Sequence, residues 1–228
     1  VSLRYVKQVR ELKNPDMIIL PGTKNTMEDL LWMRQNGLEA AILKQADQGK
    51  IIFGVCGGYQ MLGETLSDPE GVEAGGVIKG MGLLPMQTVF RENKTRTRVT
   101  GTFQALAGSL SDLSGTELEG YEIHMGTTTL ADGAKPLVRI SDQVTGSVRE
   151  DGAYRENVYG SYVHGIFDRE EVVKKIVEAI GAKKGIDVSQ MSSVDFAQFK
   201  ETQYDLLAQG LREHLDMKKI YEILDAGV

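Results

Sequence analysis

The hydrophobic positions of the first sixty residues alternate between short unbroken apolar runs and longer stretches with helical spacing. Residues 17–20, "MIIL", stop at a Pro-Gly pair, which is typical of a buried strand. Within 26–48 apolar side chains recur every three or four positions, and Gly37 predicts a break between two helical pieces. The runs "KIIF" at 50–53 and "LRYV" at 3–6 predict two further strands.

Strands that are apolar throughout and alternate with helices indicate a doubly wound α/β fold, with a mostly parallel sheet covered by helices on both faces. The pattern changes at 75–104 and 120–165, where β-branched and aromatic runs are bounded by Gly, Asp and Asn. These runs predict more strands, including antiparallel ones. An amphipathic stretch at 170–185 predicts a helix that closes the domain.

The end of the chain repeats the helical spacing. We therefore expect a core at 1–186 and a helical C-terminal extension at 187–228, packed on the core or on another domain.

Because the sequence begins with Val1 instead of Met, we also expect it to be a fragment of a longer protein. Its 228 residues, 41% of them hydrophobic, are enough for a buried core.

Charge and composition exclude several classes of partner. The formal net charge of −6, with no long cluster of Lys or Arg, is unsuited to nucleic acid or to an anionic membrane. No apolar run approaches the ~20 residues of a membrane helix, and no signal-peptide pattern begins the chain, so we expect a cytoplasmic protein. One cysteine and three scattered histidines predict neither a disulfide nor a metal site.

The single cysteine, Cys56, lies in "GVCGG" between an apolar run and a predicted helix. Gly54 and Gly58 would let a strand and a helix approach closely around a nucleophile on a tight turn. We expect the Gly57 N–H to act as an oxyanion donor and the helix N-terminus to lower the pKa of the thiol. The competing interpretation is that Cys56 is a small buried hydrophobe, as most free cysteines are.

A thiol nucleophile also needs a base. His164 ends an apolar run just before a glycine, where strand ends of a parallel sheet converge, and is the best candidate. His124, in "GYEIHMG", fits a structural or a site-lining role equally well. His214 lies on the amphipathic tail and is better explained as a solvated helix residue.

Several of these motifs together resemble the class I, triad-type glutamine amidotransferases. They are "GVCGGYQ" at 54–60, "YVHGIFD" at 162–168 and "LPGTKNTMEDL" at 20–30. The phrases "GYEIHMG" at 120–126 and "HLDMKKIYEIL" at 214–224 are similar to the glutaminase domain of the cobyric acid synthase branch. The resemblance covers essentially the whole chain and implies a flavodoxin-like α/β fold.

For the site, the resemblance implies that Cys56 attacks the side-chain amide of L-glutamine and that His164 is the general base and acid. A γ-glutamyl thioester would form with release of ammonia, and water would then hydrolyse it to glutamate. The backbone N–H groups of Gly22 and Gly57 would form the oxyanion hole. Gln60 would hold the substrate glutamine.

A further candidate comes from the residues themselves. "RENKTRTRV", at 91–99, is a local basic run in which Arg98 is a candidate for binding the substrate's carboxylate. The competing interpretation is a solvated loop or edge strand, where charged side chains are common. Both interpretations stay open at this point.

One departure from the triad pattern concerns the group that orients the histidine. The family places a carboxylate two residues after it, and here that position is Ile166. The cobyric acid synthase branch resembles this sequence in keeping only the cysteine and the histidine. A backbone carbonyl, Asp168 or Glu122 are the candidates to orient the imidazole of His164.

The sequence contains no GxxxxGK(S/T) motif, so we expect no cofactor in this chain. The resemblance implies that ATP and magnesium bind in a missing N-terminal dethiobiotin synthetase-like domain, which also binds the corrinoid. That domain would use the ammonia to amidate carboxylates of adenosylcobyrinic acid a,c-diamide in cobalamin biosynthesis. The alternatives are the glutaminase of cobyrinic acid a,c-diamide synthase, that of a cell-wall precursor amidase, or a non-catalytic α/β binding domain.

Overall fold

The computed structural model describes residues 1–188 and 196–227. The chain divides into two compact units, Val1–Met191 and Ser192–Val228. This division lies close to the predicted limit between residues 186 and 187, although residues 189–195 of the predicted extension lie outside the described part. The surface on which the extension packs stays a prediction.

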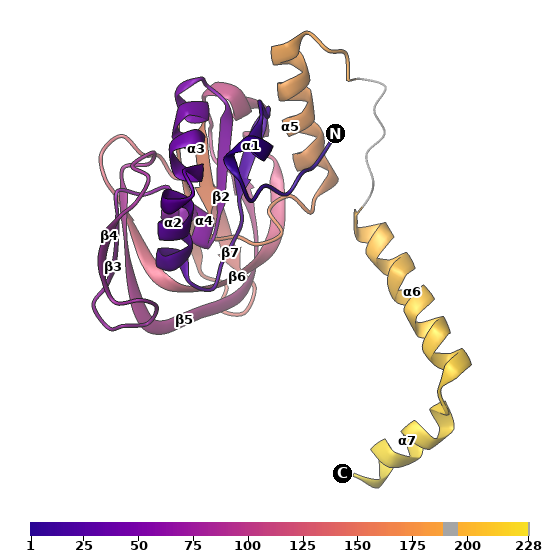
Figure 1. Ribbon diagram of the computed structural model, residues 1–228. Helices are drawn as coiled ribbons and strands as arrows, with labels where there is room; N and C mark the ends of the chain where they lie inside the picture. The colour runs from indigo at the N-terminus through magenta and orange to yellow at the C-terminus, as the bar shows by residue number, and fades with distance from the viewer. Residues whose placement is uncertain (189–195, 228) are drawn as a thin grey trace. The chain divides into compact units, whose positions relative to one another are not determined.

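The first sheet of the larger unit contains the strands that carry the predicted nucleophile and base. Its four strands are β1 (Met17–Leu20), β2 (Ile51–Val55), β10 (Val158–Ser161) and β9 (Ala153–Arg155), in the order β1-β2-β10-β9. Figure 1 labels β2 of this sheet. β2 pairs in parallel with both β1 and β10, whereas β9 pairs antiparallel at the edge. The two apolar runs therefore form adjacent parallel strands, as the sequence predicts.

Helices cover both faces of this sheet. They are α1 (Val9–Leu12), α2 (Thr26–Gln35), α3 (Leu38–Asp47), α4 (Gly57–Met61) and α5 (Glu170–Lys184). Ile52 of β2 packs in one core cluster with Met27 of α2 and Ile42 of α3. Its neighbours Ile51 and Phe53 point to the other face, into a cluster that includes residues of α5. The predicted helical break is also present, since Gly37 has a φ of 74° between α2 and α3.

The start of the chain differs from expectation. Residues 3–6 form no strand, and the first regular element is the short α1. Leu3 and Tyr5 are 73% and 88% exposed. A strand needs a neighbouring strand to receive its backbone hydrogen bonds and a core to bury alternate side chains. Val6 packs against the core, but Leu3 and Tyr5 do not, so the segment meets the second condition only in part.

The second sheet is built mainly from antiparallel pairs. It contains β3 (Thr65–Asp68), β4 (Gly76–Lys79), β5 (Met86–Phe103), β6 (Glu117–Leu130), β7 (Val138–Asp142) and β8 (Val148–Asp151). The order is β4-β3-β5-β7-β8, with β6 also paired to β5, and only β3 and β5 are parallel. A 3-10 helix, η1 (Gly108–Leu113), follows β5. The antiparallel strands expected after residue 75 are therefore confirmed.

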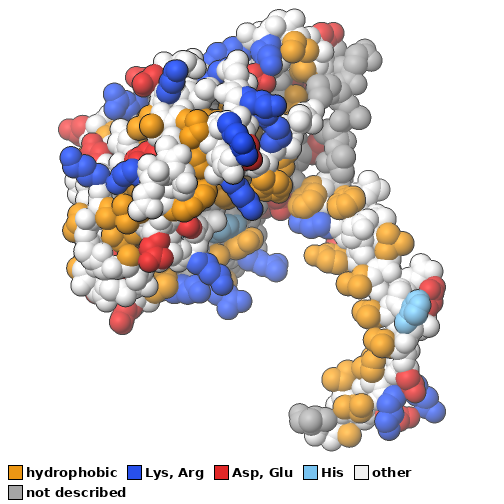
Figure 2. All heavy atoms as spheres, viewed as in Figure 1, with side chains coloured by type: hydrophobic (Ala, Val, Ile, Leu, Met, Phe, Trp, Pro, Cys, Tyr) orange, Lys and Arg blue, Asp and Glu red, His pale blue; other side chains and the backbone are white. Residues whose placement is uncertain are grey.

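The smaller unit contains the helices α6 (Phe196–His214) and α7 (Met217–Ala226). The carboxylate of Asp216 caps α7 by accepting a hydrogen bond from the Lys219 N–H at 3.0 Å. Figure 2 shows hydrophobic side chains gathered along both helices. In the described ranges, no helix is long and apolar enough to cross a membrane.

Candidate active site

Cys56 occupies a sharp turn between β2 and α4. Its φ of 52° and ψ of −111° lie where side chains other than glycine are rarely found. A Cβ added to Gly54 would lie 2.6 Å from the Gly58 carbonyl oxygen, and one added to Gly58 would lie 2.1 Å from that of Leu20. Only glycine fits at either position, so the strained turn predicted from the glycine spacing is present.

The thiol of Cys56 is buried and protonated at neutral pH. The residue is 6% exposed, and its Sγ lies 3.7 Å from the carbonyl oxygen of Ile123 in β6. Burial raises the pKa of Cys56 to about 11, although a hydrogen bond from the Gly57 N–H acts in the opposite direction. The expectation that the helix N-terminus lowers this pKa is therefore wrong, because removal of water outweighs one backbone donor on a five-residue helix.

The strand that leads to the predicted base, His164, is hydrogen-bonded to the predicted nucleophile, Cys56. The backbone N–H of Cys56 donates to the carbonyl oxygen of Ser161, the last residue of β10, at 2.9 Å. His164 follows three residues later. The nucleophile and the base candidate thus extend from neighbouring parallel strands, as the sequence predicts.

Gly22, the predicted oxyanion-hole residue in the loop after β1, lies next to both Cys56 and His164. A Cβ added to Gly22 would lie 3.0 Å from Cε1 of His164 and 3.4 Å from Cβ of Cys56. One added to Gly57 would lie 2.7 Å from Cγ2 of Thr23, the residue after Gly22. Backbone from the loop after β1 and from the start of α4 therefore encloses the cysteine and the histidine.

The imidazole of His164 is suited to accept a proton. Its Nε2 is buried and has no hydrogen-bond partner among residues 1–188 and 196–227. Burial also lowers the pKa of His164, so the ring is neutral at pH 7. The ring of Tyr121 stacks on it, with the two planes 8° apart. A neutral imidazole beside a protonated thiol is the resting state of the pair.

The carboxylates considered as orienting groups have different surroundings. Ile166, at the position of the family's carboxylate, is 1% exposed and belongs to the apolar cluster on the α5 side. Glu122 is ion-paired with Arg149 and lies 3.9 Å from Nε2 of His124. Burial raises the pKa of Glu122 to about 7. Asp168 lies beside Gly165, whose carbonyl oxygen accepts from the Asp168 N–H at 2.8 Å.

Gln60 is held in a buried network behind the turn. Its Oε1 accepts from Oγ1 of Thr26 at 3.0 Å, and its Nε2 donates to the hydroxyl of Tyr162 at 3.2 Å. The ring of His124 stacks on Tyr162, with centroids 3.7 Å apart, and its Nδ1 lies 3.1 Å from the Gly126 carbonyl oxygen. The amide of Gln60 therefore links α2, α4 and the segment after β10, and its contact with substrate stays a prediction.

Arg98 lies on the exposed side of β5 near the stacked pair. It is directly opposite Tyr121 in the antiparallel pairing of β5 with β6. Opposed residues of such a pair present their side chains on the same face of the sheet. Arg98 is exposed, as is Arg96, which is opposite Ile123. The basic run thus forms an exposed row opposite Tyr121 and Ile123 of β6, and the contact of Arg98 with substrate stays a prediction.

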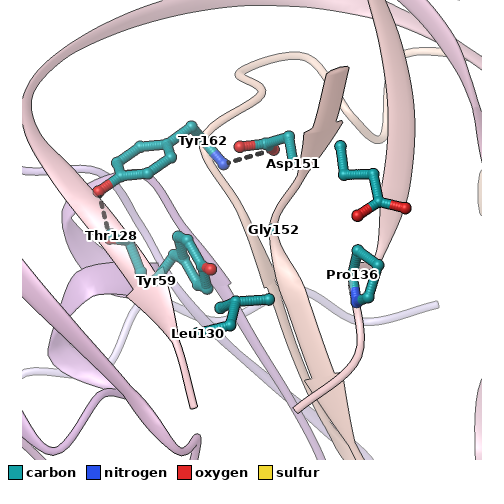
Figure 3. A pocket seen from close by; sticks show the side chains of 8 residues that line it. Tyr59, Thr128, Leu130, Pro136, Asp151, Gly152 and Tyr162 are labelled. Atoms are coloured by element: carbon teal, nitrogen blue, oxygen red, sulfur yellow. Dashed lines mark hydrogen bonds between the residues drawn. The ribbon is translucent and has the colours of Figure 1, made fainter. Parts of the chain in front are cut away.

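A cavity of about 240 Å³ lies beyond the turn, lined by Tyr59, Tyr162, Asp151 and neighbouring residues (Figure 3). The Asp151 carboxylate accepts from Oγ of Ser161 at 2.5 Å and from the Tyr162 N–H at 3.1 Å. The Tyr162 hydroxyl also bonds Oγ1 of Thr128 at 2.6 Å. These contacts brace the segment between β10 and His164. In the described part of the chain, no cluster of His, Cys, Asp and Glu could hold a metal ion.

Two contacts of the site were not identified from the sequence. They are the Tyr121 ring on His164 and the Ile123 carbonyl near Cys56, both supplied by β6. The motif "GYEIHMG" contains both residues and marks this strand as part of the site. The pairing register that decides which of its side chains faces the histidine is visible only in the fold.

Comparison with known proteins identifies the family of this chain. The model of a CobB/CobQ-like glutamine amidotransferase domain matches residues 1–172. A cobyric acid synthase of Ruminiclostridium cellulolyticum is 50% identical, in an alignment that covers 100% of this chain and 45% of that protein. One of Lachnoclostridium phytofermentans is 49% identical, with coverages of 100% and 46%. The chain thus spans less than half the length of these curated relatives.

Solved structures share the fold at low sequence identity. A glutamine amidotransferase crystal structure has a TM-score of 0.54 and 16% identity, covering 79% of this chain and 87% of the other. PurLQS from Thermotoga maritima has a TM-score of 0.51 and 21% identity, with coverages of 76% and 82%. These likenesses confirm the predicted fold class.

Proposed function

The chain belongs to the CobB/CobQ-like glutamine amidotransferase family, and from this premise we propose that it is the glutamine-hydrolysing domain of a cobyric acid synthase. One observation carries the chemical part of the proposal. Cys56, on a strained turn, and His164, with an unpartnered buried Nε2, both lie against the backbone of Gly22. A nucleophile, a base and backbone beside both are what amide hydrolysis through a thioester requires.

In the first half of the reaction, Sγ of Cys56 attacks the carbon of the substrate's side-chain amide while its proton passes to Nε2 of His164. The carbonyl oxygen becomes an oxyanion that accepts from the backbone N–H groups of Gly22 and Gly57, each worth about 3 kcal/mol to the barrier. The C–N bond then breaks, and His164 returns the proton to the leaving nitrogen, which departs as ammonia. A γ-glutamyl thioester remains on Cys56.

In the second half, His164 removes a proton from water as the water oxygen attacks the thioester carbon. The C–S bond breaks, the proton returns to sulfur, and glutamate leaves. No external oxidant or metal is needed to balance these steps. The raised pKa of Cys56 keeps the thiol neutral until the base acts.

Arg98 is the residue that we expect to select the substrate by its charge. Glutamine carries an α-carboxylate, and the exposed Arg98 lies across from Tyr121, whose ring stacks on His164. A guanidinium offers a carboxylate two parallel N–H donors. Gln60 is bonded to Thr26 and Tyr162, and it would meet the substrate by exchanging one of these bonds.

We infer the fate of the ammonia from the relatives, which are named cobyric acid synthase and are about twice as long as this chain. An N-terminal dethiobiotin synthetase-like domain would bind ATP, magnesium and the corrinoid, and would amidate its carboxylates. No P-loop motif occurs in this sequence. Cobyrinic acid a,c-diamide synthesis and cell-wall precursor amidation remain the alternative acceptors, and purifying the joined synthetase half distinguishes them.

The test is covalent labelling of the 228-residue chain with a diazoketone analogue of L-glutamine, read by intact mass and peptide mapping. We expect one adduct on Cys56, protected by L-glutamine but not by D-glutamine. Cys56→Ser should give no adduct, and His164→Gln should slow its formation. The assay is repeated with the synthetase half added, which completes some glutaminase sites. Absence of a Cys56 adduct under both conditions would refute the proposal and favour a non-catalytic binding domain.

A further inference from the structure

The family's third catalytic group is a carboxylate, and Ile166 is buried in the apolar core where that group would be. We propose that the Tyr121 ring takes its place as the positioning residue for His164, by stacking on the imidazole and fixing its plane. This inference rests on the proposed glutamine hydrolysis. Tyr121 acts through the histidine and does not touch the reacting atoms in this role.

The two residues are joined by ring and backbone contacts at once. Their ring centroids are 5.0 Å apart and the planes differ by 8°. The Tyr121 N–H donates to the His164 carbonyl oxygen at 3.1 Å, and the His164 N–H donates to the Tyr121 carbonyl oxygen at 2.8 Å. A reciprocal pair of backbone hydrogen bonds fixes both Cα positions, so the two side chains that stack start from fixed backbone positions.

The neighbouring glycine makes this close pairing possible. A Cβ added to Gly120 would lie 2.1 Å from the His164 carbonyl oxygen and 2.7 Å from Cγ1 of Val163. No other residue fits there without moving the strand. On the other side, the backbone of Gly22 faces Cε1 of the imidazole. The ring is therefore confined by Tyr121 on one face and by Gly22 along an edge.

Of the carboxylates considered above, Glu122 fits this site less well than the Tyr121 ring. Glu122 follows Tyr121 in the strand and therefore points to the opposite face, where it pairs with Arg149. The hydroxyl of Tyr121 is not needed for the stack. Tyr121 is 49% exposed, so its ring contributes little to the core, and its main described contact is the imidazole.

A stacked ring also explains why Nε2 stays available. A carboxylate would bind a ring nitrogen and stabilise the charged imidazolium. A phenol ring restricts the plane of the imidazole and excludes water from one face while leaving both nitrogens free of a negative partner. The consequence is a base that is neutral at rest and already aimed, which suits proton transfer from a neutral thiol.

The test compares Tyr121→Phe, which keeps the stack, with Tyr121→Leu, which removes the ring but keeps an apolar side chain. Tyr5→Leu, on a side chain that is 88% exposed, is the matched control. For glutamine hydrolysis we expect Tyr121→Leu to lower kcat by roughly 10- to 100-fold, the cost of a misplacement near 1 Å. KM should change little, and Tyr121→Phe should stay within about twofold of the original chain.

A second readout does not depend on activity. In the same variants, NMR titration of the ring signals follows each of the three histidines, with His164→Gln used to assign His164. Loss of the Tyr121 ring exposes the imidazole to water, so the pKa of His164 should rise in Tyr121→Leu and stay unchanged in Tyr121→Phe. The other titratable groups around it, the Cys56 thiol, His124 and Asp168, are the same in both variants.

Two results would overturn the inference. One is a Tyr121→Leu chain with unchanged kcat and an unchanged pKa of His164. The other is a Tyr121→Phe chain as impaired as Tyr121→Leu, which would assign the role to the hydroxyl. If the original chain, with its synthetase half, hydrolyses no glutamine, the proposed function fails, and the NMR titration still decides whether the ring controls His164.

Discussion

Burial of the Cys56 thiol should make the free energy of unfolding of this chain fall as the pH rises above 9. The folded state holds its pKa at about 11, against an ordinary value of 9.0, because burial penalises the thiolate. An acid whose pKa is higher in the folded state favours folding while it is protonated. Its contribution is therefore complete below pH 9 and is lost as the pH rises from 9 to 11.

The size of this effect follows from the two pKa values. A difference of about two pH units corresponds to roughly 3 kcal/mol when the transition is complete. Between pH 8 and pH 10 the loss is about 1.3 kcal/mol, because only part of the titration has then occurred. The side chain is buried, so solvent screening leaves this value largely intact.

The assay is urea unfolding of the original chain and of Cys56→Ser at pH 8, 9, 10 and 10.5. Lysines and tyrosines titrate in both proteins, so the difference between their free energies of unfolding isolates the cysteine. We expect the original chain to lose about 1.3 kcal/mol relative to Cys56→Ser by pH 10. The ultraviolet absorbance of the thiolate, followed in the folded protein, gives the pKa independently.

A difference that stays constant from pH 8 to pH 10.5 would refute the reasoning. So would a thiolate that appears below pH 8.5 in the folded chain. The first result would mean that the Gly57 N–H fully offsets the effect of burial on the pKa of Cys56. The second would mean that the Gly57 N–H outweighs burial, and that the resting nucleophile is an anion. The proposed first proton transfer to His164 would then be unnecessary.

Two further predictions concern the turn and the basic row. Gly58→Ala would place a methyl group against the Leu20 carbonyl, so we expect the free energy of unfolding in urea to fall by about 3 kcal/mol or more. The control, Gly210→Ala, lies in open space on α6 and should be neutral or slightly stabilising. Equal effects of the two substitutions would contradict the steric argument. Arg98→Gln should raise KM for glutamine about tenfold with kcat nearly unchanged, measured by glutamate release, and an unchanged KM would leave Arg98 as a solvated strand residue.

Local patterns in the sequence were sufficient for the elements around the nucleophile. Unbroken apolar runs identified β1 and β2, and the glycines at 54 and 58 identified the tight turn, because both signals act within a few residues. The run at 3–6 has the composition of a strand but forms none, and of its apolar side chains Val6 packs against the core while Leu3 and Tyr5 are exposed. An apolar run forms a strand only where the fold places another strand beside it.

The parts of the site that depend on distant segments could not be predicted in this way. The pKa of Cys56 depends on how completely the surrounding strands exclude water, which no local motif specifies. The contact of Tyr121 with His164 depends on the register between β6 and the segment after β10. A shift by one residue would have presented Glu122 instead, so the sequence alone left the orienting group open.

The hydrogen bond from the Cys56 N–H to the Ser161 carbonyl has a consequence for how this domain can be reused. It belongs to the pairing of two adjacent strands, so the spacing of nucleophile and base is set within one sheet of one chain. Exchange of the synthetase half for another acceptor enzyme would leave that spacing unchanged. On the proposed function, the two residues would release ammonia in the same way whichever acceptor domain is joined to them, and a change of product would require changes in the acceptor domain alone.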